Sequence, residues 1–326
     1  MRIRALDAQT IRGLVSYEEL IPLMRTTLAA VSRGEAELPL RWALQLPKEA
    51  GMLVMMPGYL GPEASAGIKL VSLVPNAAMN GRSSHLGVVM LYDADGLVPV
   101  AMLCGSTVTA LRTAATTACA TDVLAPTSAR TLAILGSGEQ ADAHLSALQL
   151  VRHFVVVRIW SRTPAHAAAL AARYESSGLR IEVCNSVAAA VDAADVICTL
   201  THSPTSILPG NLVQPGVHVN LVGASGRGRS ETDDNLVARS RFFVDYRPAA
   251  RSQAGELLGA IERGIVSEEH IAGEIGEVIA GKRPGRTLVT DLTVFKSVGI
   301  AAEDIALAAH TYRKAERLGR GQMVEL

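Results

Sequence analysis

Residues 131–141, TLAILGSGEQA, place the strongest constraint on how this chain of 326 residues folds. The unbroken apolar run LAIL is typical of a buried parallel strand, and Gly136, Gly138 and Ala141 follow it in G-x-G-x-x-A spacing. The first glycine permits a tight turn, the second lets a pyrophosphate approach the backbone, and the alanine lets a helix pack closely on the strand. We expect that helix over residues 139–150, with its free N–H groups facing the phosphates. The alternative is an ordinary strand-to-helix turn of another α/β domain.

The position that reads the cofactor ribose holds no acid. A second apolar run, residues 154–160, ends about twenty residues past Ala141, where the ribose-reading residue is expected, and Ser161, Arg162 and Thr163 follow it. An acid there would accept the 2′-hydroxyl of NAD, whereas a 2′-phosphate needs a cation and hydroxyl groups. The segment therefore predicts NADPH in preference to NADH, unless Arg162 is a solvated loop residue.

Charge and cysteine content exclude several classes of partner. The 31 Lys and Arg balance the 31 Asp and Glu, so no basic field is available to hold nucleic acid or an anionic membrane. The four cysteines lack metal-ligand or redox spacing, which suits reduced thiols in the cytoplasm. The charged N-terminus argues against a signal peptide, and prolines divide the uncharged stretch 196–226. His144, His202 and His218 have no ligand-spaced partner, so we expect no metal.

The first third of the chain predicts a helix, a largely antiparallel sheet and then a long helix. The helix over residues 17–33 opens this domain, and residues 106–124 form the long helix that leads out of it. The strands are short apolar runs between Gly and Pro, at residues 40–46, 52–56, 68–74, 88–92 and 97–103.

Alternating strands and helices then predict a doubly wound domain. We expect its strands at residues 132–135, 155–160, 180–184, 196–200, 217–222 and 242–245, and helices at 249–262 and 267–280. Residues 286–299 look irregular, and 300–317 form an amphipathic helix that returns to the first domain. The fold class is therefore α/β, with a Rossmann-type parallel-sheet domain at 116–297 and an α+β domain made of 1–115 and 298–326.

Three cations lie in apolar surroundings: Arg41, Lys69 and Arg112. A charge with such neighbours is either paired or held at a functional cleft, because unpaired burial is costly. Each alone fits a structural ion pair, but three around one cleft suit a clamp for a substrate carboxylate.

Several motifs together resemble the ornithine cyclodeaminase and mu-crystallin family. They are GIKLVSLVPN, STVTALRTAATTACAT, LGSGEQA, GEIGEVIAGKRPGR and LTVFKSVGIAAEDIALA, in that order along nearly the whole chain. The resemblance implies homodimers, with an N-terminal substrate and dimerisation domain completed by the C-terminal helix. It also implies that Arg41, Lys69 and Arg112 hold the substrate carboxylate and that residues 296–297 come near the nicotinamide.

The chain departs from the cyclodeaminase branch at the groups that deamination needs. Ser225 replaces an Asp in the loop after the fifth strand, Val54 replaces a Glu, and the ribose-reading acid is missing. The GAS loop, WSRTP and SSHLG are instead similar to the ketimine reductase branch, which reduces Δ1-pyrroline-2-carboxylate or Δ1-piperideine-2-carboxylate with NADPH to proline or pipecolate. Such a reaction needs mainly orientation, a carboxylate clamp and a proton source.

The proton source stays open between Lys69 and His85, and Ser225 is a third candidate catalytic residue. Lys69 either joins the clamp or protonates the imine nitrogen, and burial beside two arginines would lower its pKa toward the second role. His85 is another candidate, or a histidine hydrogen-bonded at a strand edge. Ser225 offers a hydroxyl group near the imine or the ribose, or else caps the backbone.

The predicted cofactor contacts gather on the turn, the ribose segment and the carboxyl ends of the later strands. They are Thr113, Gly136, Ser137, Gly138, Glu139, Gln140, Ser161, Arg162, Thr163, Thr199, Leu200, Thr201, Val222, Gly223, Lys296 and Ser297. The leading interpretation is an NADPH-dependent reductase of a cyclic imino acid. The alternatives are ornithine cyclodeaminase, an amino-acid dehydrogenase acting on alanine, and a mu-crystallin-like protein that binds NADPH and a small ligand.

Overall fold

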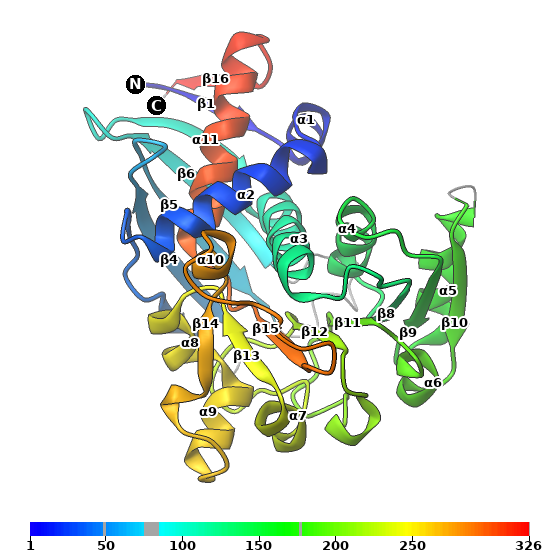
Figure 1. Cartoon of the computed structure of the whole chain (residues 1–326). Coiled ribbons are helices and arrows are strands. Elements are labelled where there is room, and N and C mark those ends of the chain that lie inside the picture. The colour runs from blue at the N-terminus through cyan, green and yellow to red at the C-terminus, as the bar shows by residue number, and fades with distance from the viewer. Residues whose placement is uncertain (48–49, 75–84, 176–177, 326) are drawn as a thin grey trace. The chain divides into compact units, whose positions relative to one another are not determined.

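The computed structural model describes residues 1–47, 50–74, 85–175 and 178–325, which form two compact units. Unit 1 comprises Met1–Thr116 and Gly299–Leu326, and unit 2 comprises Thr117–Val298 (Figure 1). Unit 2 is thus inserted into unit 1 along the chain, and helix α3 (Gly105–Leu124) runs from one into the other.

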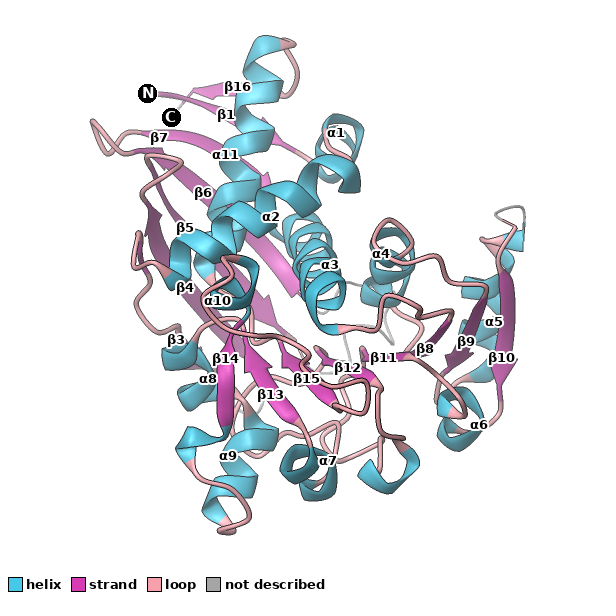
Figure 2. Cartoon of the chain, in the orientation of Figure 1, coloured by secondary structure: helices cyan, strands magenta, loops and turns pink. Residues whose placement is uncertain are grey.

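An eight-stranded sheet forms the body of unit 1, as Figure 2 shows in magenta. Its strand order is β16-β1-β7-β6-β5-β4-β2, with β3 paired to β4, and all pairs except β1 with β7 are antiparallel. The strands are β1 (Arg2–Leu6), β2 (Ala36–Glu37), β3 (Trp42–Gln45), β4 (Met52–Leu60), β5 (Ser65–Leu73), β6 (His85–Asp93), β7 (Pro99–Cys104) and β16 (Gln322–Glu325).

Three helices accompany this sheet: α1 (Ala8–Leu14), α2 (Tyr17–Ser32) and α11 (Ala301–Arg317). Helix α11 packs on β4, β5, β6 and α2, so the last helix returns to the first domain as predicted. Ile305 of α11 lies against Gly67 of β5, where an added Cβ atom would come within 2.9 Å of it. The prediction that a helix opens the domain is wrong, because β1 and α1 precede α2 and charges interrupt their apolar residues.

Unit 2 is built on an eight-stranded parallel sheet in the order β10-β9-β8-β11-β12-β15-β13-β14. Because β9 and β11 flank β8, the chain reverses direction across the sheet at β8, which is where such sheets bind ligands. The strands are β8 (Thr131–Leu135), β9 (Val156–Trp160), β10 (Arg180–Cys184), β11 (Val196–Thr199), β12 (His218–Leu221), β13 (Arg241–Val244), β14 (Ile271–Glu274) and β15 (Thr293–Lys296). The α/β fold class is therefore confirmed.

Short helices connect these strands. They are α4 (Glu139–Leu148), α5 (Pro164–Ala172), α6 (Val187–Val191), α7 (Asp234–Arg239), α8 (Arg247–Gln253), α9 (Gly255–Glu262) and α10 (Ile275–Ile279), with single 3-10 turns at Gly210–Leu212 and Glu268–His270. In the described part of the chain, no helix is both long and apolar enough to traverse a lipid bilayer.

Three predictions in the second half of unit 2 are wrong. Residues 267–280 hold strand β14 and helix α10 instead of one helix, and the irregular stretch 286–299 contains β15, a strand in the sheet interior. The helix expected over 249–262 is two helices, because Ala254 leaves the helical region with φ −77° and ψ 85°. Strands β14 and β15 are each four residues long and end in a charged residue, Glu274 and Lys296 respectively. Such short segments with a terminal charge lack the apolar pattern by which a buried strand is predicted.

Candidate functional site

The three predicted cations come together in unit 1. Lys69 of β5 is 3% exposed and Arg112 of α3 is 5% exposed, while Arg41 is half-buried. The Nη2 atom of Arg41 donates to the carbonyl of Gly299 at 2.9 Å. A Cβ atom on Gly299 would lie 2.8 Å from the guanidinium of Arg112, and its φ of 75° also favours glycine.

Two acids at the start of α11 pair with these cations. Glu303 Oε2 lies 2.6 Å from Nη1 of Arg112, and Asp304 bridges Nε of Arg112 at 3.1 Å and Nζ of Lys69 at 2.7 Å. Both acids are buried, and their place in the first turn of the helix suits a negative charge. We call these five residues the charge cluster: Arg41, Lys69, Arg112, Glu303 and Asp304.

The charge cluster brings three cations and two carboxylates together. Guanidinium groups form paired hydrogen bonds with carboxylates, which is the contact that a substrate carboxylate would need. Glu303 and Asp304 were not predicted, because acids in the first turn of an amphipathic helix resemble a solvated face.

Burial lowers the pKa of Lys69 to about 8, because the charged ammonium loses its water. The attraction of Asp304 opposes this shift, while the charges of Arg112 and Arg41 add to it. Lys69 Nζ also lies 3.5 Å from Oγ1 of Thr109. A lysine with such a pKa can change its protonation near neutral pH.

The other predicted residues of unit 1 are not part of the charge cluster. Thr113 is buried and its hydroxyl donates to the carbonyl of Thr109 at 2.6 Å. His85 begins β6 and pairs with Leu73, but its side chain lies outside the described residues, as do Ser83 and Ser84 of SSHLG. Val54, the third residue of β4, is 3% exposed, so this position holds a buried apolar side chain and no carboxylate.

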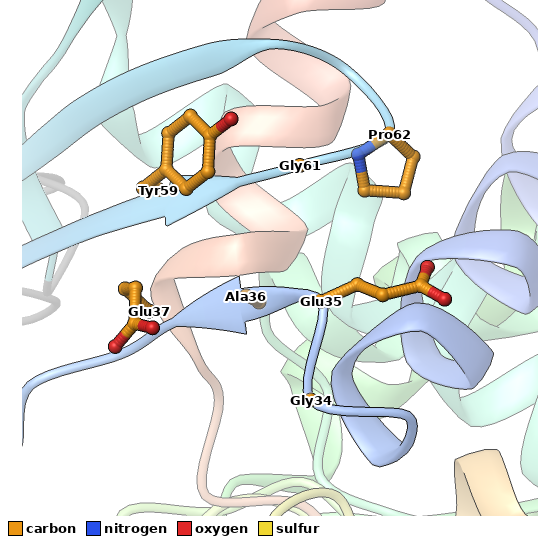
Figure 3. A pocket seen from close by; sticks show the side chains of 7 residues that line it. All are labelled: Gly34, Glu35, Ala36, Glu37, Tyr59, Gly61 and Pro62. Carbon is orange, nitrogen blue, oxygen red and sulfur yellow. The ribbon is translucent and has the colours of Figure 1, made fainter.

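A hollow of about 450 Å³ in unit 1 contains none of these residues. It is lined by residues 34–37, Tyr59, Gly61 and Pro62, and Figure 3 shows Glu37 and Tyr59 on the paired strands β2 and β4. Its ionisable lining is acidic, and Glu35 already pairs with Arg33 at 2.6 Å. The hollow is therefore unsuited to an anionic ligand.

The glycine turn of unit 2 has the geometry of a phosphate cradle. Gly136 has a φ of 134°, and a Cβ atom there would lie 2.6 Å from the carbonyl oxygen of Leu200. Gly138 is the N-cap of α4 and leaves open space, since an added Cβ atom would meet nothing within 4 Å. Ala141 is fully buried where α4 packs on the strand. The turn therefore leaves room for a pyrophosphate over Gly138, at the N-terminus of a ten-residue helix.

The first turn of α4 also carries the side-chain amide of Gln140. The side-chain oxygen of Gln140 is buried and accepts no hydrogen bond from the described residues. Ser137 Oγ donates to Ser161 Oγ at 2.8 Å and so links the turn to the ribose segment, in which Arg162 and Thr163 are exposed. These features fit a dinucleotide bound at this turn.

The remaining predicted cofactor residues end strands at the carboxyl edge of this sheet. A fully buried acid, Glu231, accepts hydrogen bonds from the Thr199 hydroxyl, the Thr201 backbone and hydroxyl, and the backbone N–H of Gly223. Glu231 gave no sequence signal, because it lies in the polar loop RGRSETDD.

The rest of this group differs in exposure. Leu200 is 8% exposed, Val222 is half-buried and Ser225 is exposed. Lys296 is fully buried, donates to the carbonyl of Ala224 and pairs with Glu256 at 3.0 Å. Ser297, which follows β15, is 3% exposed.

The histidines considered as metal ligands have protein partners. Burial lowers the pKa of His144 to about 4, and its ring lies 3.0 Å from the Thr117 hydroxyl and 2.7 Å from the carbonyl of Gln140. His218 lies 3.0 Å from the hydroxyl of Thr293. Over the residues that the structure describes, no three His, Cys, Asp or Glu side chains gather as a metal site would require.

Residues 4–318 match the family model described as "Ornithine cyclodeaminase/mu-crystallin family". The chain belongs to this family. Ketimine reductase mu-crystallin of Rattus norvegicus is 37% identical over 302 residues, which cover 92% of this chain and 93% of the relative. The expectation of family membership is therefore confirmed.

Two solved structures agree with this chain in fold over nearly its whole length. Δ1-pyrroline-2-carboxylate reductase of Thermococcus litoralis, in complex with NADH and L-proline, is 30% identical with a TM-score of 0.95, covering 98% of this chain and 99% of that one. An archaeal alanine dehydrogenase dimer with bound NAD is 27% identical with a TM-score of 0.94, covering 100% of both chains. The prediction of an oxidoreductase that acts on carbon–nitrogen bonds is confirmed by the reductase relatives.

Proposed function

We propose that this enzyme reduces a cyclic ketimine carboxylate, either Δ1-pyrroline-2-carboxylate or Δ1-piperideine-2-carboxylate, to proline or pipecolate with NADPH. The observation that carries the proposal is the charge cluster, which brings two guanidinium groups and a buried lysine together, a set of donors that suits a substrate carboxylate. The names of the relatives support the same reaction class. The buried Val54 and the exposed Ser225 offer no carboxylate for deamination, which disfavours ornithine cyclodeaminase.

In this proposal Arg41 and Arg112 bind the substrate carboxylate, because planar guanidinium groups form paired hydrogen bonds with it. Gly136, Gly138 and the first turn of α4 hold the dinucleotide, and Gln140 offers it a buried acceptor. The bound dihydronicotinamide supplies a hydride for C2 of the imine. Lys69, in its protonated form, either strengthens the carboxylate clamp or gives its proton to the ring nitrogen.

The test is oxidation of NADPH by the purified protein with each of the two imines. Turnover of either imine, with proline or pipecolate as product, is the expected result. Three other assays check the alternatives: release of ammonia and proline from ornithine without net reduction of cofactor, reductive amination of pyruvate with ammonia, and thermal shifts by small ligands without turnover. A protein that reduces neither imine would refute the proposal.

The pKa of Lys69 predicts how imine reduction depends on pH. Lys69 carries its proton below about pH 8 and loses it above, so kcat/KM for the imine should fall as pH rises through that value. Replacement by arginine, which stays protonated, separates the two roles. If Lys69 only binds the carboxylate, K69R removes the decline; if Lys69 donates the proton, K69R lowers kcat across the whole range. A wild-type profile that matches K69R in both height and shape would exclude both roles.

Ser161, Arg162 and Thr163 support NADPH as the preferred cofactor. We expect kcat/KM to be at least about tenfold higher with NADPH than with NADH, because a phosphate–guanidinium contact is charge-assisted. R162A should remove most of this preference without changing the NADH reaction. R180A at the start of β10, at the amino edge of the sheet, is the matched control. Equal kcat/KM for both cofactors in the wild type would contradict the preference.

We also propose that the enzyme is a homodimer formed through β3 and its neighbours. All four residues of β3 are exposed, including Trp42 at 55% and Leu44 at 45%, and an apolar face of this kind usually marks an interface. A related structure is described as a dimer, which favours a second copy as the partner. Sedimentation should give twice the 34.3 kDa chain mass. W42E should dissociate the dimer, whereas V289E, on an exposed loop of unit 2, should leave it intact.

A further inference from the structure

Glu231 joins two loops at the carboxyl edge of the unit 2 sheet. Its carboxylate accepts five hydrogen bonds: from the hydroxyl of Thr199 at 2.8 Å, the N–H and hydroxyl of Thr201 at 2.8 and 2.6 Å, and the N–H groups of Gly223 and Ala224 at 2.7 and 3.1 Å. Thr199 ends β11 and Thr201 follows it, while Gly223 and Ala224 follow β12. One buried side chain therefore fixes the distance between two strand ends.

These strand ends lie next to the glycine turn. The backbone oxygen of Leu200 is the atom that a Cβ on Gly136 would approach to 2.6 Å. The backbone of Gly223 also lies close to a neighbouring loop, because an added Cβ atom would clash with the carbonyl oxygen of Thr201. The two loops that Glu231 joins thus continue the edge at which a parallel sheet of this topology binds its ligand.

A second set of contacts closes a ring around Ala224. Its N–H donates to Glu231 at 3.1 Å, while its carbonyl accepts from Lys296, which pairs with Glu256 at 3.0 Å. Glu256 in turn accepts from the backbone N–H of Glu231 at 3.3 Å. All three ionisable residues are at most 2% exposed. The ring holds both polar groups of Ala224 and so fixes the backbone that presents the exposed Ser225.

We propose that Glu231 is a positioning residue that sets the two loops in the geometry required by the nicotinamide half of the cofactor. The inference rests on the proposed function, because it assumes that a nicotinamide dinucleotide binds at this edge. Loops already fixed in the free protein do not have to be ordered by the ligand, so the affinity for the cofactor is higher. Glu231 acts through Thr201, Gly223 and Ala224 and does not itself touch the substrate.

Replacement of Glu231 by glutamine tests this role, because the side chain keeps its size but loses one of its two acceptor oxygens. An amide has one acceptor oxygen and places its NH₂ group against N–H donors, so E231Q cannot satisfy both loops. We expect the KM for NADPH to rise at least about tenfold, with a smaller change in the KM for the imine. E231D keeps the carboxylate but is shorter by one methylene group, and its KM for NADPH should lie between those of the wild type and E231Q.

Asp195 provides a matched control at the opposite edge of the same sheet. Its Oδ2 atom accepts from the N–H groups of Arg130 and Thr131 at 2.7 and 2.9 Å, and so joins the amino ends of β8 and β11. D195N removes the same kind of link between strands. A purely structural role for Glu231 predicts that E231Q and D195N have the same effect on the KM for NADPH, once both are measured below their unfolding temperatures.

The experiment combines titration of NADPH fluorescence, steady-state kinetics with both imines and thermal unfolding of the wild type, E231Q, E231D and D195N. Weaker NADPH binding in E231Q than in D195N supports the inference, and equal binding overturns it. If E231Q does not fold, T201V, which removes one hydroxyl donor, should raise the KM for NADPH several-fold, and an unchanged KM overturns the inference. Failure of the wild type to bind any nicotinamide dinucleotide would instead refute the proposed function.

Discussion

G138V is expected to fold like the wild type and to bind NADPH at least about a hundredfold more weakly, which corresponds to roughly 3 kcal/mol. The backbone of Gly138 is extended, with φ −87° and ψ −167°, and a new Cβ atom would meet no atom within 4 Å. Valine is therefore tolerated by the protein itself, and its branched side chain fills the space in which the pyrophosphate would approach α4. Loss of glycine at the N-cap costs about 1 kcal/mol or less in stability.

Fluorescence titration and thermal unfolding of G138V separate cofactor binding from folding. G136A is the contrasting variant, since its positive φ and the oxygen of Leu200 at 2.6 Å predict lost stability as well as lost binding. G13A in α1 of unit 1, where an added Cβ atom also meets nothing within 4 Å, should change neither NADPH affinity nor activity. Undiminished NADPH affinity in G138V would show that the dinucleotide does not lie over this turn.

R112A is expected to destabilise the enzyme by about 3–5 kcal/mol, because it removes a cation from two buried carboxylates. Glu303 and Asp304 are 0% and 1% exposed, so water cannot replace the guanidinium. R112K keeps the charge but loses the forked geometry. R112K should therefore fold, and its kcat/KM for the imine should fall about a hundredfold while its affinity for NADPH stays unchanged.

Arg152 is the matched control for Arg112, because it is a buried arginine in unit 2 with an equally dense set of partners. It pairs with Asp122 at 2.9 Å and donates to the backbone carbonyls of Pro126, Asp122 and Ala125. R152K should lose stability in denaturant unfolding without a change in the KM for the imine. If kcat/KM for the imine were unchanged in R112K, the charge cluster would have only a structural role and would not bind the substrate.

The sequence predicted unit 2 best where the local pattern and the tertiary environment agree. Strand β8 is an apolar run followed by glycines that only this turn requires, and both are visible in isolation. Strand β15 could not be recognised, because it has four residues and its last one, Lys296, is a charge that the fold buries through Glu256 and Ala224. A lysine can be buried in an interior strand here because Glu256 and the carbonyl group of Ala224 bind its ammonium group.

The same difference separates the cations of the charge cluster from the acids. Arg41, Lys69 and Arg112 interrupt apolar segments and could be selected from the sequence. Glu303 and Asp304 begin a helix that reads as amphipathic, so acids in its first turn resemble a solvated face. Glu231 lies in a loop of polar residues, and its five donors come from segments up to 32 residues away. Residues whose partners lie far away in the sequence produce no local pattern from which their role could be predicted.

The insertion of unit 2 into unit 1 sets an order of events on the ribosome. Lys69 and Arg112 are synthesised well before α11, which carries their counter-ions. Strand β1 pairs with β7 on one side and gains its second neighbour only when β16 is made. The nascent protein can complete its parallel sheet at Lys296 while the first sheet still lacks its closing helix. A truncation that removes α11 would therefore leave the buried Lys69 and Arg112 without the carboxylates of Glu303 and Asp304.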